Sequence, residues 1–362
     1  MDSITQFALG ACVGVAVLGR RIGPRRAALT GGLLGTLPDM DVFLRHSDPV
    51  DAFVNHRGWS HSLLVHAALT PVLGEIITRF SKALSGERAI AYTAVFLCLA
   101  THALLDALTI YGTRLFWPVW NEPVSVGSMF IIDPLYTIPL LVAVGWAMAC
   151  RSWTPRYGKV LLASLGFTTA YLAWSLIAQQ IVTGKANGLL ADIGVAPDRL
   201  IATPTPFNTV FWRVVGIDGD ISFNLDIPVF GHTENPALYT YRRNLGINAC
   251  SANDDRIARI AEFSHGFYRI MVQDDEVIVA DMRMGLTPNY AFRFILGRLE
   301  AGKLVPAPTR RIEGRGNLSE DLDWLIANLT GNYTIRPAEA AARTELTHYP
   351  VIARLASPSR DC

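Results

Sequence analysis

An imidazole and a carboxylate lie four residues apart within an apolar stretch of the sequence, at His102 and Asp106. Residues spaced by four share one face of a helix, so these two side chains can reach the same cation or each other. Ionisable groups are costly inside a bilayer, which makes them functional candidates there. A hydrogen-bonded pair that joins two helices is the alternative interpretation.

A denser polar segment, His56-Arg57-Gly58-Trp59-Ser60-His61-Ser62, precedes another apolar run. Its two histidines can converge if Gly58 supplies a turn, and a serine can cap the helix that follows. The planar guanidinium of Arg57 suits an anionic oxygen, phosphate above all. Alternatively, the segment anchors the helix at the lipid headgroups. His66 is rotated from His61 by about 140° around that helix, which favours a place in the core or behind a ligand.

Further carboxylates stand where apolar runs begin or end. Pro38-Asp39-Met40-Asp41 places two of them two residues apart, a spacing that can bridge two metals or supply one ligand and one acceptor for a ligating histidine. Asp2 opens the first apolar run and Asp133 opens the fifth. Loop solvation is the alternative for the first pair, and aspartate is also an ordinary helix N-cap.

Histidine and carboxylate together are the ligand set expected for Zn²⁺, with Mn²⁺ as the alternative where oxygen ligands dominate. Such a metal makes hydroxide from bound water, and two ions can clamp a phosphoester. In this scheme Asp41 accepts the proton of the water and Arg57 balances the phosphate charge. The sequence has no G-x-S-x-G, P-loop or Rossmann glycine pattern, so serine hydrolases and nucleotide-driven mechanisms lose their main support.

The composition divides the chain into two halves. Of 362 residues, 51% are hydrophobic and 17% charged, which is too apolar for a wholly water-exposed protein. Residues 1–182 hold 13 Lys/Arg and 10 Asp/Glu, whereas the rest, of nearly equal length, holds 19 and 21. The near-neutral balance predicts no nucleic-acid partner. The five cysteines fit buried small side chains, because none belongs to a C-x-x-C pair.

The first half predicts a polytopic α-helical membrane domain of about four long and two short helices. The long apolar runs are 62–80, 89–110, 130–150 and 160–182, and the short glycine-rich ones are 4–18 and 27–37. A span needs about 20 mostly apolar residues, and small residues permit close packing between helices.

Basic residues predict the orientation of these helices. They gather in alternate connections, at 20–26, 79–88 and 151–159. By the positive-inside rule these connections are cytoplasmic, which places the N-terminus, the connections 38–60 and 111–129, and everything after Val182 outside. The acids and imidazoles described above then meet in one layer at the outer end of the helices.

The second half predicts a soluble α+β domain. We expect the membrane domain at 1–183, a proline-rich linker at 184–207 and an extracytoplasmic domain at 208–362. Strands are expected at 211–215 and 221–225, paired as a hairpin, and at 267–272, 276–280 and 290–295, with helices at 318–327 and 337–342. This domain could cap the site, select substrates or dock a partner protein.

Several spaced motifs carry a family likeness. They are Met1-Asp2-Ser3-Ile4-Thr5-Gln6 with Gly10, Leu37-Pro38-Asp39-Met40-Asp41, the segment 56–62, Thr101-His102-Ala103-Leu104-Leu105-Asp106 with Thr109-Ile110-Tyr111-Gly112, and Ile131-Ile132-Asp133-Pro134-Leu135-Tyr136-Thr137. These motifs cover most of the first 140 residues and resemble the bacterial membrane-bound metal-dependent hydrolases of the YdjM-like (DUF457) family.

The resemblance implies a multi-pass protein of the bacterial inner (cytoplasmic) membrane, assigned as a hydrolase and distantly similar to the helical zinc-dependent phospholipase C and P1 nuclease group. Carried over residue by residue, it implies Asp39, His56, His61, His102 and Asp106 as metal ligands, followed by Asp41 and Asp133. Family members often have Thr-His near the start, where this sequence has Thr5-Gln6, so Asp2 is the N-terminal ligand candidate.

Three functions compete at this stage. The leading hypothesis is a metal-dependent hydrolase that cleaves a phosphoester of a lipid or lipid-linked substrate at the outer membrane–water boundary, because a site at headgroup depth meets lipids first. The second is a non-enzymatic membrane scaffold or envelope-stress protein with a structural metal site. The third is an ion-coupled transporter, which would use Glu75 and the intramembrane His/Asp pair.

Overall fold

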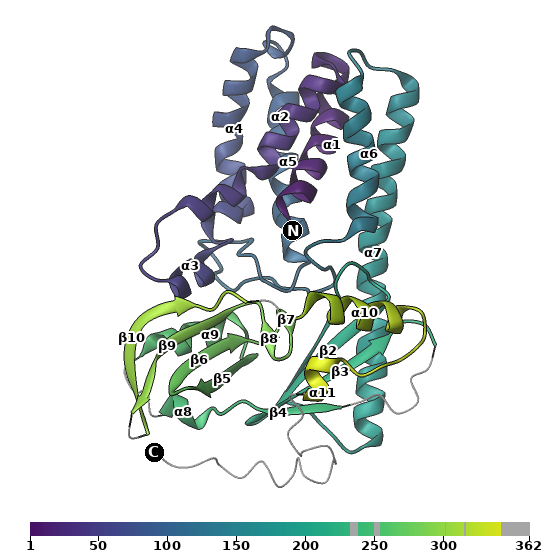
Figure 1. Cartoon of the computed structure of the whole chain (residues 1–362). Helices are drawn as coiled ribbons and strands as arrows, with labels where there is room; N and C mark the ends of the chain where they lie inside the picture. The colour runs from purple at the N-terminus through teal and green to yellow at the C-terminus, as the bar shows by residue number, and fades with distance from the viewer. Residues whose placement is uncertain (232–237, 250–253, 301, 315, 342–362) are drawn as a thin grey trace. The chain divides into compact units, whose positions relative to one another are not determined.

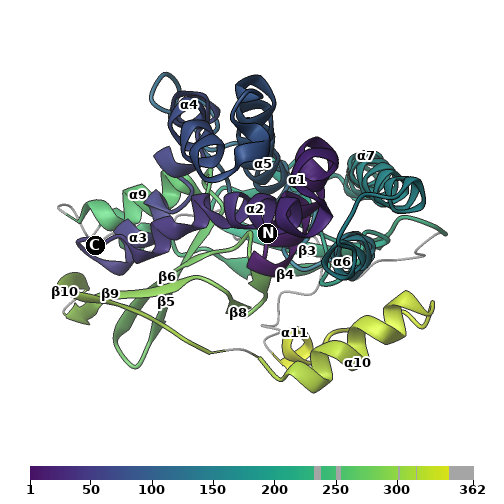
Figure 2. The ribbon, with the colours of Figure 1, turned by 90° about the horizontal axis from the view of Figure 1, so that it is seen from above.

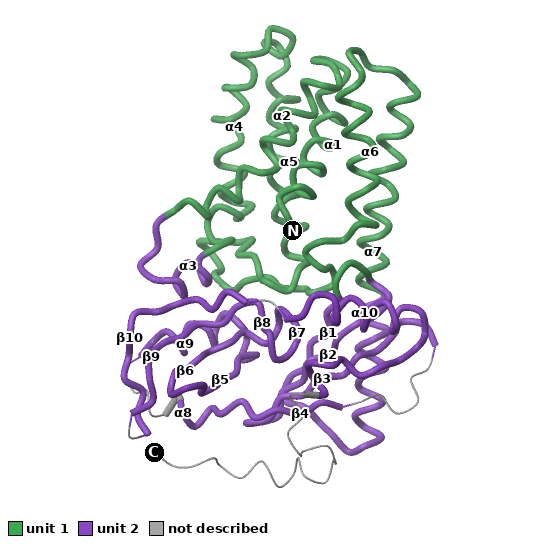
Figure 3. The backbone as a smooth tube through the Cα atoms, viewed as in Figure 1, with its two compact units in different colours: residues 1–44, 56–177, 206–208 green, residues 45–55, 178–205, 209–362 purple. Residues whose placement is uncertain are grey.

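The computed structural model describes residues 1–231, 238–249, 254–300, 302–314 and 316–341, and the chain divides into two compact units. Unit 1 comprises residues 1–44, 56–177 and 206–208, and unit 2 comprises residues 45–55, 178–205 and 209–362 (Figure 3). Unit 1 is built from helices, and unit 2 holds the β-sheets (Figure 1). This is the predicted fold class, a helical membrane half followed by an α+β half.

Six helices run lengthwise through unit 1. They are α1 (Ser3–Ile22), α2 (Pro24–Thr36), α4 (Leu63–Phe80), α5 (Arg88–Ala107), α6 (Pro134–Ala149) and the first part of α7 (Pro155–Asp192). The pair α1 and α2 contacts both α5 and α6, and α4 packs on α5 (Figure 2). Short 3₁₀ helices η1 (Pro38–Phe43), η2 (Trp59–His61) and η3 (Lys82–Leu84) lie in the connections.

The helices of unit 1 bring their ends together in two separate layers. In one layer, Arg21 pairs with Glu87 at 3.3 Å, and Arg20 lies over the ring of Trp153. In the other layer, the amide of Asp2 donates to the carbonyl of Ile131 at 3.1 Å. The basic connections therefore lie at the opposite end of the bundle from the start of α1, as the sequence predicts.

Glycines allow α1 and α2 to touch along their backbones. A Cβ added at Gly10 would lie 2.4 Å from the carbonyl oxygen of Gly31, and one added at Gly31 would lie 2.2 Å from that of Gly10. Cβ atoms added at Gly14 and Gly35 would likewise lie close to the opposite helix, at 2.7 Å and 2.8 Å from its backbone. The close packing expected of the two glycine-rich runs is therefore present.

Two helix lengths differ from the prediction. The first run extends to Ile22, because the two arginines at its end continue the helix into the basic layer, so α1 has 20 residues. The run at 130–150 holds only the 16 residues of α6, because Asp133 caps its start. Among the described residues, the helices long and apolar enough to cross a membrane are α1, α4, α5 and α7.

Helix α7 replaces the first part of the predicted linker. It has 38 residues, a length of about 57 Å at 1.5 Å per residue, compared with about 30 Å for the hydrocarbon core of a bilayer. The rest of the supposed linker contains strand β1 (Arg199–Pro204), which pairs with β2 (Phe211–Asp218). Its last residue, Pro204, lies at an edge strand, where the missing N–H of proline is tolerated.

Unit 2 contains two antiparallel four-stranded sheets and a small hairpin. The first sheet has the order β1-β2-β3-β4, with β3 (Ile221–Pro228) and β4 (Tyr239–Arg242), and the second has the order β10-β9-β6-β5, formed by β5 (Tyr268–Gln273), β6 (Glu276–Asp281), β9 (Arg293–Glu300) and β10 (Lys303–Arg311). Strands β7 (Gly285–Leu286) and β8 (Asn289–Tyr290) form the hairpin. Helices α8 (Gly246–Ala249), α9 (Asp255–Phe263), α10 (Leu318–Leu329) and α11 (Pro337–Ala341) accompany them.

Most predicted elements of this half are present. The expected hairpin is β2–β3, in register from Phe211 opposite Pro228 to Asp218 opposite Ile221. The predicted strand at 290–295 is divided between β8 and β9, and residue 342, the last of the final predicted helix, lies outside the described residues. Helix α3 (Pro49–Asn55) also belongs to unit 2, where the ring of Phe53 lies 4.9 Å from that of Phe263 on α9.

Candidate metal centre

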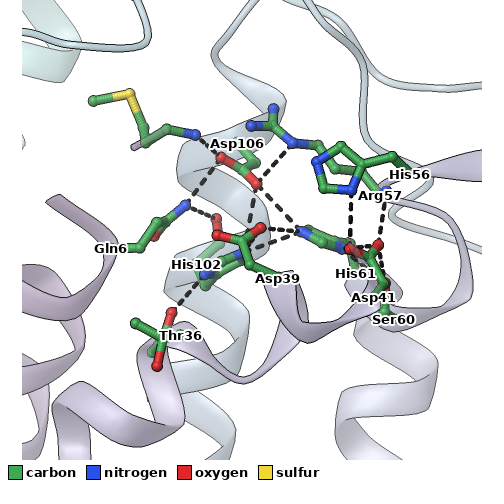
Figure 4. A network of polar contacts seen from close by, with 12 residues as sticks. Gln6, Thr36, Asp39, Asp41, His56, Arg57, Ser60, His61, His102 and Asp106 are labelled. Carbon is green, nitrogen blue, oxygen red and sulfur yellow. Dashed lines mark hydrogen bonds and ion pairs between the residues drawn. The ribbon is translucent and has the colours of Figure 1, made fainter. Parts of the chain in front are cut away.

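Four side chains converge at the end of the bundle where α1 begins and α5 ends (Figure 4). Asp39 comes from η1 and His61 from η2, while His102 and Asp106 lie one turn apart on α5. One donor atom from each of the four lies within 4.8 Å of all the others. The two histidines and Asp106 are fully buried, and the side chain of Asp39 is 18% exposed.

Most distances between the donor atoms match those around a tetrahedral ion. The Nε2 atom of His61 lies 3.0 Å from Nε2 of His102, 3.4 Å from Oδ1 of Asp39 and 3.3 Å from Oδ2 of Asp106. The Nε2 atom of His102 lies 3.5 Å and 3.4 Å from the same two oxygens. Tetrahedral zinc with bonds of about 2.0–2.1 Å requires ligand–ligand distances of about 3.3 Å. The four donors therefore fit such an ion with little movement.

Backbone and side-chain acceptors set the tautomers of both histidines. Nδ1 of His102 lies 2.6 Å from the carbonyl oxygen of Gly35, so it must donate its proton there. Nδ1 of His61 lies 2.9 Å from Oγ of Ser60, and that hydroxyl donates to Oδ2 of Asp41 at 2.8 Å. Because both Nδ1 atoms carry the proton, both neutral imidazoles direct an Nε2 lone pair into the cluster.

With both imidazoles in these neutral tautomers, the centre of the cluster holds only acceptors. Two Nε2 lone pairs and two carboxylate oxygens face one another, and among the described residues Oδ2 of Asp106 has no hydrogen-bond partner although it is buried. An unsatisfied buried carboxylate oxygen is costly. A divalent cation bound by these four atoms removes both the repulsion and the missing bond, so the residues fit a metal ion.

The second oxygen of Asp106 is held from the α1 side. The side-chain amide of Gln6 donates to Oδ1 at 2.9 Å, and the amino group of Met1 also contacts Oδ1. Gln6 is fully buried and donates to the carbonyl of His102 as well, at 3.3 Å. These contacts turn Oδ2 toward the other donors.

Arg57 places a buried guanidinium beside the cluster. Its Nε lies 3.2 Å from Oδ2 of Asp106, its Nη1 donates to Thr109 at 2.9 Å, and its charge lies 5.0 Å above the ring of Tyr111. Arg57 is 6% exposed and has a φ of 60°, a left-handed conformation that is strained for a residue with a side chain. Such strain is retained mainly where function or a rigid surrounding requires it.

Asp41 lies behind His61 and does not face the cluster. Its Oδ1 bonds Nδ1 of His56 at 2.9 Å, and its Oδ2 accepts from the backbone of Arg57 at 3.0 Å and from Ser60. Burial acts to raise the pKa of Asp41, but the hydrogen bond with His56 and the neighbouring imidazole and hydroxyl outweigh it, so the pKa lies below its ordinary value. With both oxygens engaged, Asp41 orients His61 and does not suit the proton-accepting role expected from the sequence.

His56 also lies outside the cluster, contrary to the expectation of a ligand. The chain turns at Arg57, so the ring of His56 faces Asp41 and the ring of Tyr111, whose centroid is 5.5 Å away. Another histidine of this region, His66, is buried on α4 and donates from Nε2 to the carbonyl of Ser60 at 2.8 Å. It lies behind the ligand-bearing segment, as its helical phase predicts.

Asp2 and Asp133 are helix caps in this structure, so neither reaches the cluster as a ligand. Oδ1 of Asp2 accepts from the amides of Ile4 and Thr5, at 3.1 Å and 3.0 Å. Oδ1 of Asp133 accepts from the first turn of α6, and its Oδ2 accepts from the hydroxyl of Tyr171 at 2.8 Å. The N-cap alternative weighed from the sequence for Asp133 describes that residue, and Asp2 is an N-cap as well.

The fold and the cluster define a multi-pass membrane protein with a His₂Asp₂ candidate metal centre. Residues 1–182 match the family model described as YdjM inner membrane protein, and the chain belongs to that family. It is 33% identical to the inner membrane protein YbcI of Escherichia coli over 162 residues, which cover 44% of this chain and 86% of YbcI. It is 24% identical to YfhP of Bacillus subtilis, a protein named as uncharacterized, over 274 residues that cover 73% of this chain and 80% of YfhP. No solved structure matches the chain.

Proposed function

We propose that this protein is a membrane-bound metal-dependent hydrolase that cleaves a phosphoester of a lipid or lipid-linked substrate at the outer membrane–water boundary. The observation that carries the proposal is the set of four converging donors, three of them on buried side chains, with a buried arginine directly beside it. Zn²⁺, or alternatively Mn²⁺, would be held by Asp39, His61, His102 and Asp106. Bound there, it would supply a Lewis acid and a water of lowered pKa.

Charge favours an anionic substrate at this place. The carboxylates of Asp39 and Asp106 would balance the charge of a divalent ion, and the guanidinium of Arg57 adds a positive charge directly beside them. Nη1 of that guanidinium is held by Thr109, and its Nε faces Asp106. A phosphate oxygen is a suitable partner for it, because guanidinium groups bind phosphate through charge-assisted hydrogen bonds. Arg57 would thus orient the substrate and balance charge that develops at the phosphoryl oxygens.

Access to the centre is from the side of Asp39. The other three donors are fully buried, whereas the Asp39 side chain is 18% exposed. A substrate oxygen would reach a bound ion from this side, next to the Asp39 carboxylate, because catalytic zinc sites keep a position open for substrate or water.

The orientation in the membrane belongs to the same proposal. Most arginines and lysines of unit 1 lie in the connections at the end opposite the cluster, and by the positive-inside rule that end would be cytoplasmic. The candidate metal centre would then face the outer leaflet, and the second half of the chain, reached through α7, would be extracytoplasmic.

A structural metal site in a membrane scaffold is the second candidate. One observation favours it, namely that the protein offers four donors, the number that fills a structural zinc site. The two candidates predict the same metal content and differ in turnover.

The test uses the full-length protein, purified in detergent, depleted of metal and then supplied with Zn²⁺ or Mn²⁺. Phosphate release is measured from phosphatidic acid vesicles, and bis(p-nitrophenyl) phosphate serves as a soluble phosphodiester. Hydrolysis should require the metal, and Arg57→Gln should reduce it about 10²–10³-fold, as loss of one charge-stabilising donor does, while it retains the metal. His46→Gln, a matched change outside the cluster, should keep both. Metal binding without metal-dependent turnover of either substrate would support the scaffold instead.

A further inference from the structure

Exposed apolar side chains alternate with the polar residues of η1. Asp39 faces the cluster and Asp41 lies behind it, whereas Met40, Val42 and Phe43 are 54%, 61% and 76% exposed. A short 3₁₀ helix with this pattern has one polar inner side and one apolar outer side. Its outer side carries no charge among these residues.

The same arrangement recurs at η2 and in the loop that lies against it. Trp59, next to the Ser60–His61 pair, is 48% exposed. The hydroxyl of Ser62 donates to the carbonyl of Trp117 at 2.6 Å, so the loop 115–120 packs on the segment that carries His61. In this loop, the exposed fractions of Phe116, Val119 and Trp120 are 40%, 82% and 49%.

These outward residues are unusual for a loop in water. Connections between helices are ordinarily polar, and contiguous exposed apolar side chains mark contact with a membrane or another protein. Residues 116–120 contain no charged side chain and include two tryptophans, a residue type enriched at the headgroup level of a bilayer.

Continuity with a membrane-crossing helix favours the bilayer as the partner. Helix α4 starts directly after η2. Its 18 residues are apolar enough to cross a membrane, and only 22% of them are buried within the protein. The exposed residues that follow one another along it are Leu64, Leu69, Val72 and Ile76. The apolar surface of α4 thus begins within a few residues of Trp59 in the sequence.

We propose that an apolar rim, formed by residues 40–44, Trp59 and 116–120, inserts into the interface of the lipid leaflet at which the candidate metal centre opens. Met40 directly follows Asp39, and Trp59 directly precedes the Ser60–His61 pair. Insertion of the rim therefore brings lipid into contact with residues adjacent in the sequence to those of the ion site. Lipids then reach the centre sideways, from the leaflet, past Asp39. The lateral entry rests on the proposed function, whereas the insertion of the rim does not.

Photo-crosslinking from the lipid tests the insertion directly. The full-length protein is reconstituted into phosphatidylethanolamine–phosphatidylglycerol vesicles that contain a phospholipid with a diazirine near the top of its acyl chain, and adducts are mapped by peptide mass spectrometry. We expect adducts in 40–44 and 116–120 as well as on α4. Adducts on α4, with none in the two loops, would overturn the proposal and leave a protein partner as the cover of the rim.

A charge placed in the rim provides a second measurement. Val119→Asp should lower the adduct yield in 116–120 at least fivefold without changing the bound metal, because a carboxylate resists entry into the interface. Val305→Asp, the same change at an exposed valine of β10, should leave the yield unchanged. Equal yields in all three proteins would contradict insertion. Adducts in the loops without any phosphoester hydrolysis would sustain the rim and reject the hydrolase.

Discussion

The Nδ1 atom of His102 lies 2.6 Å from the carbonyl oxygen of Gly35, so the end of α2 orients an imidazole on α5. Gly35 belongs to the set of glycines through which α2 touches α1, and its own Cβ position lies 2.8 Å from the carbonyl oxygen of Gln6. The close packing of α1 and α2 and the orientation of the candidate ligand His102 therefore depend on the same residue, Gly35.

Substitution within the glycine contact should therefore affect both stability and metal binding. In Gly31→Ala the new Cβ would meet the carbonyl oxygen of Gly10 at 2.2 Å, which forces α1 and α2 apart. We expect a loss of about 1–3 kcal/mol, the usual cost of overpacking, and weaker zinc binding. Thermal unfolding in detergent and zinc titration measure the two effects. Gly145→Ala on α6, where no atom lies within 4 Å of the new Cβ, is the matched control. Equal behaviour of the two variants would contradict the role of the glycine contact.

Removal of either imidazole should abolish stoichiometric metal binding. His61→Ala and His102→Ala each delete one of four donors in a buried cluster that has no spare ligand at hand among its described neighbours. The purified variants should lose bound zinc or manganese after dialysis, as measured by plasma mass spectrometry. His46→Ala removes a histidine that pairs with Asp51 instead and should retain the metal. Full retention by both cluster variants would reject the metal centre.

Loss of the Ser60 hydroxyl should weaken the metal without removing a ligand. Ser60 joins His61 to Asp41, and groups that orient a ligating histidine typically contribute 10–100-fold in metal affinity. Ser60→Ala should raise the zinc dissociation constant by about this factor, measured by competition with a chelating dye. Ser85→Ala, an exposed serine beyond the end of η3, should leave it unchanged.

The attachment of α3 within unit 2 should weaken in acid. Burial alone would raise the pKa of Asp51, but hydrogen bonds from Ser47 and the charge of Arg259 outweigh it and lower that pKa. A carboxylate with a lowered folded-state pKa stabilises the fold above its unfolded pKa of about 4, and this contribution is lost as the pH falls through the folded value. Hydrogen exchange of α3 should therefore separate wild type from Asp51→Asn at pH 7, by less than about 1 kcal/mol for a partly exposed pair. The two proteins should converge near pH 3, and a gap that widens in acid would contradict the assignment.

The helical half of the protein was largely predictable because membrane helices are specified by long apolar runs and their ends by charge. The two helix lengths that differ have local causes. Arginines continue α1 past its apolar part, and Asp133 delays the start of α6. Strand β1 was hidden in a segment rich in prolines, because pairing with β2 is a tertiary contact that composition does not report.

The centre was predictable to the extent that residue type and helical spacing decide it. His102 and Asp106 share a helix face, and Asp39 and His61 stand at the ends of apolar runs, so these four could be named from the sequence. The sequence does not distinguish an aspartate that binds a metal from one that caps a helix or orients a ligand. The roles of Asp2, Asp41 and Asp133 could therefore not be assigned from it. The carbonyl of Gly35 is a backbone atom and leaves no trace in residue identity, and Ser60 could be recognised only as a helix-capping residue.

Between η1 and η2 the chain leaves the helical unit, because residues 45–55 fold with the sheets. There Phe53 lies within 5.3 Å, centroid to centroid, of the rings of Phe292 and Phe294 as well as close to Phe263. A protein shortened to its membrane half would keep all four donors. It would also expose the ring of Phe53, which belongs to the segment 45–55 between Asp39 and His61 in the sequence. The connection between two of the four donors is therefore packed by aromatic rings from the second half of the chain.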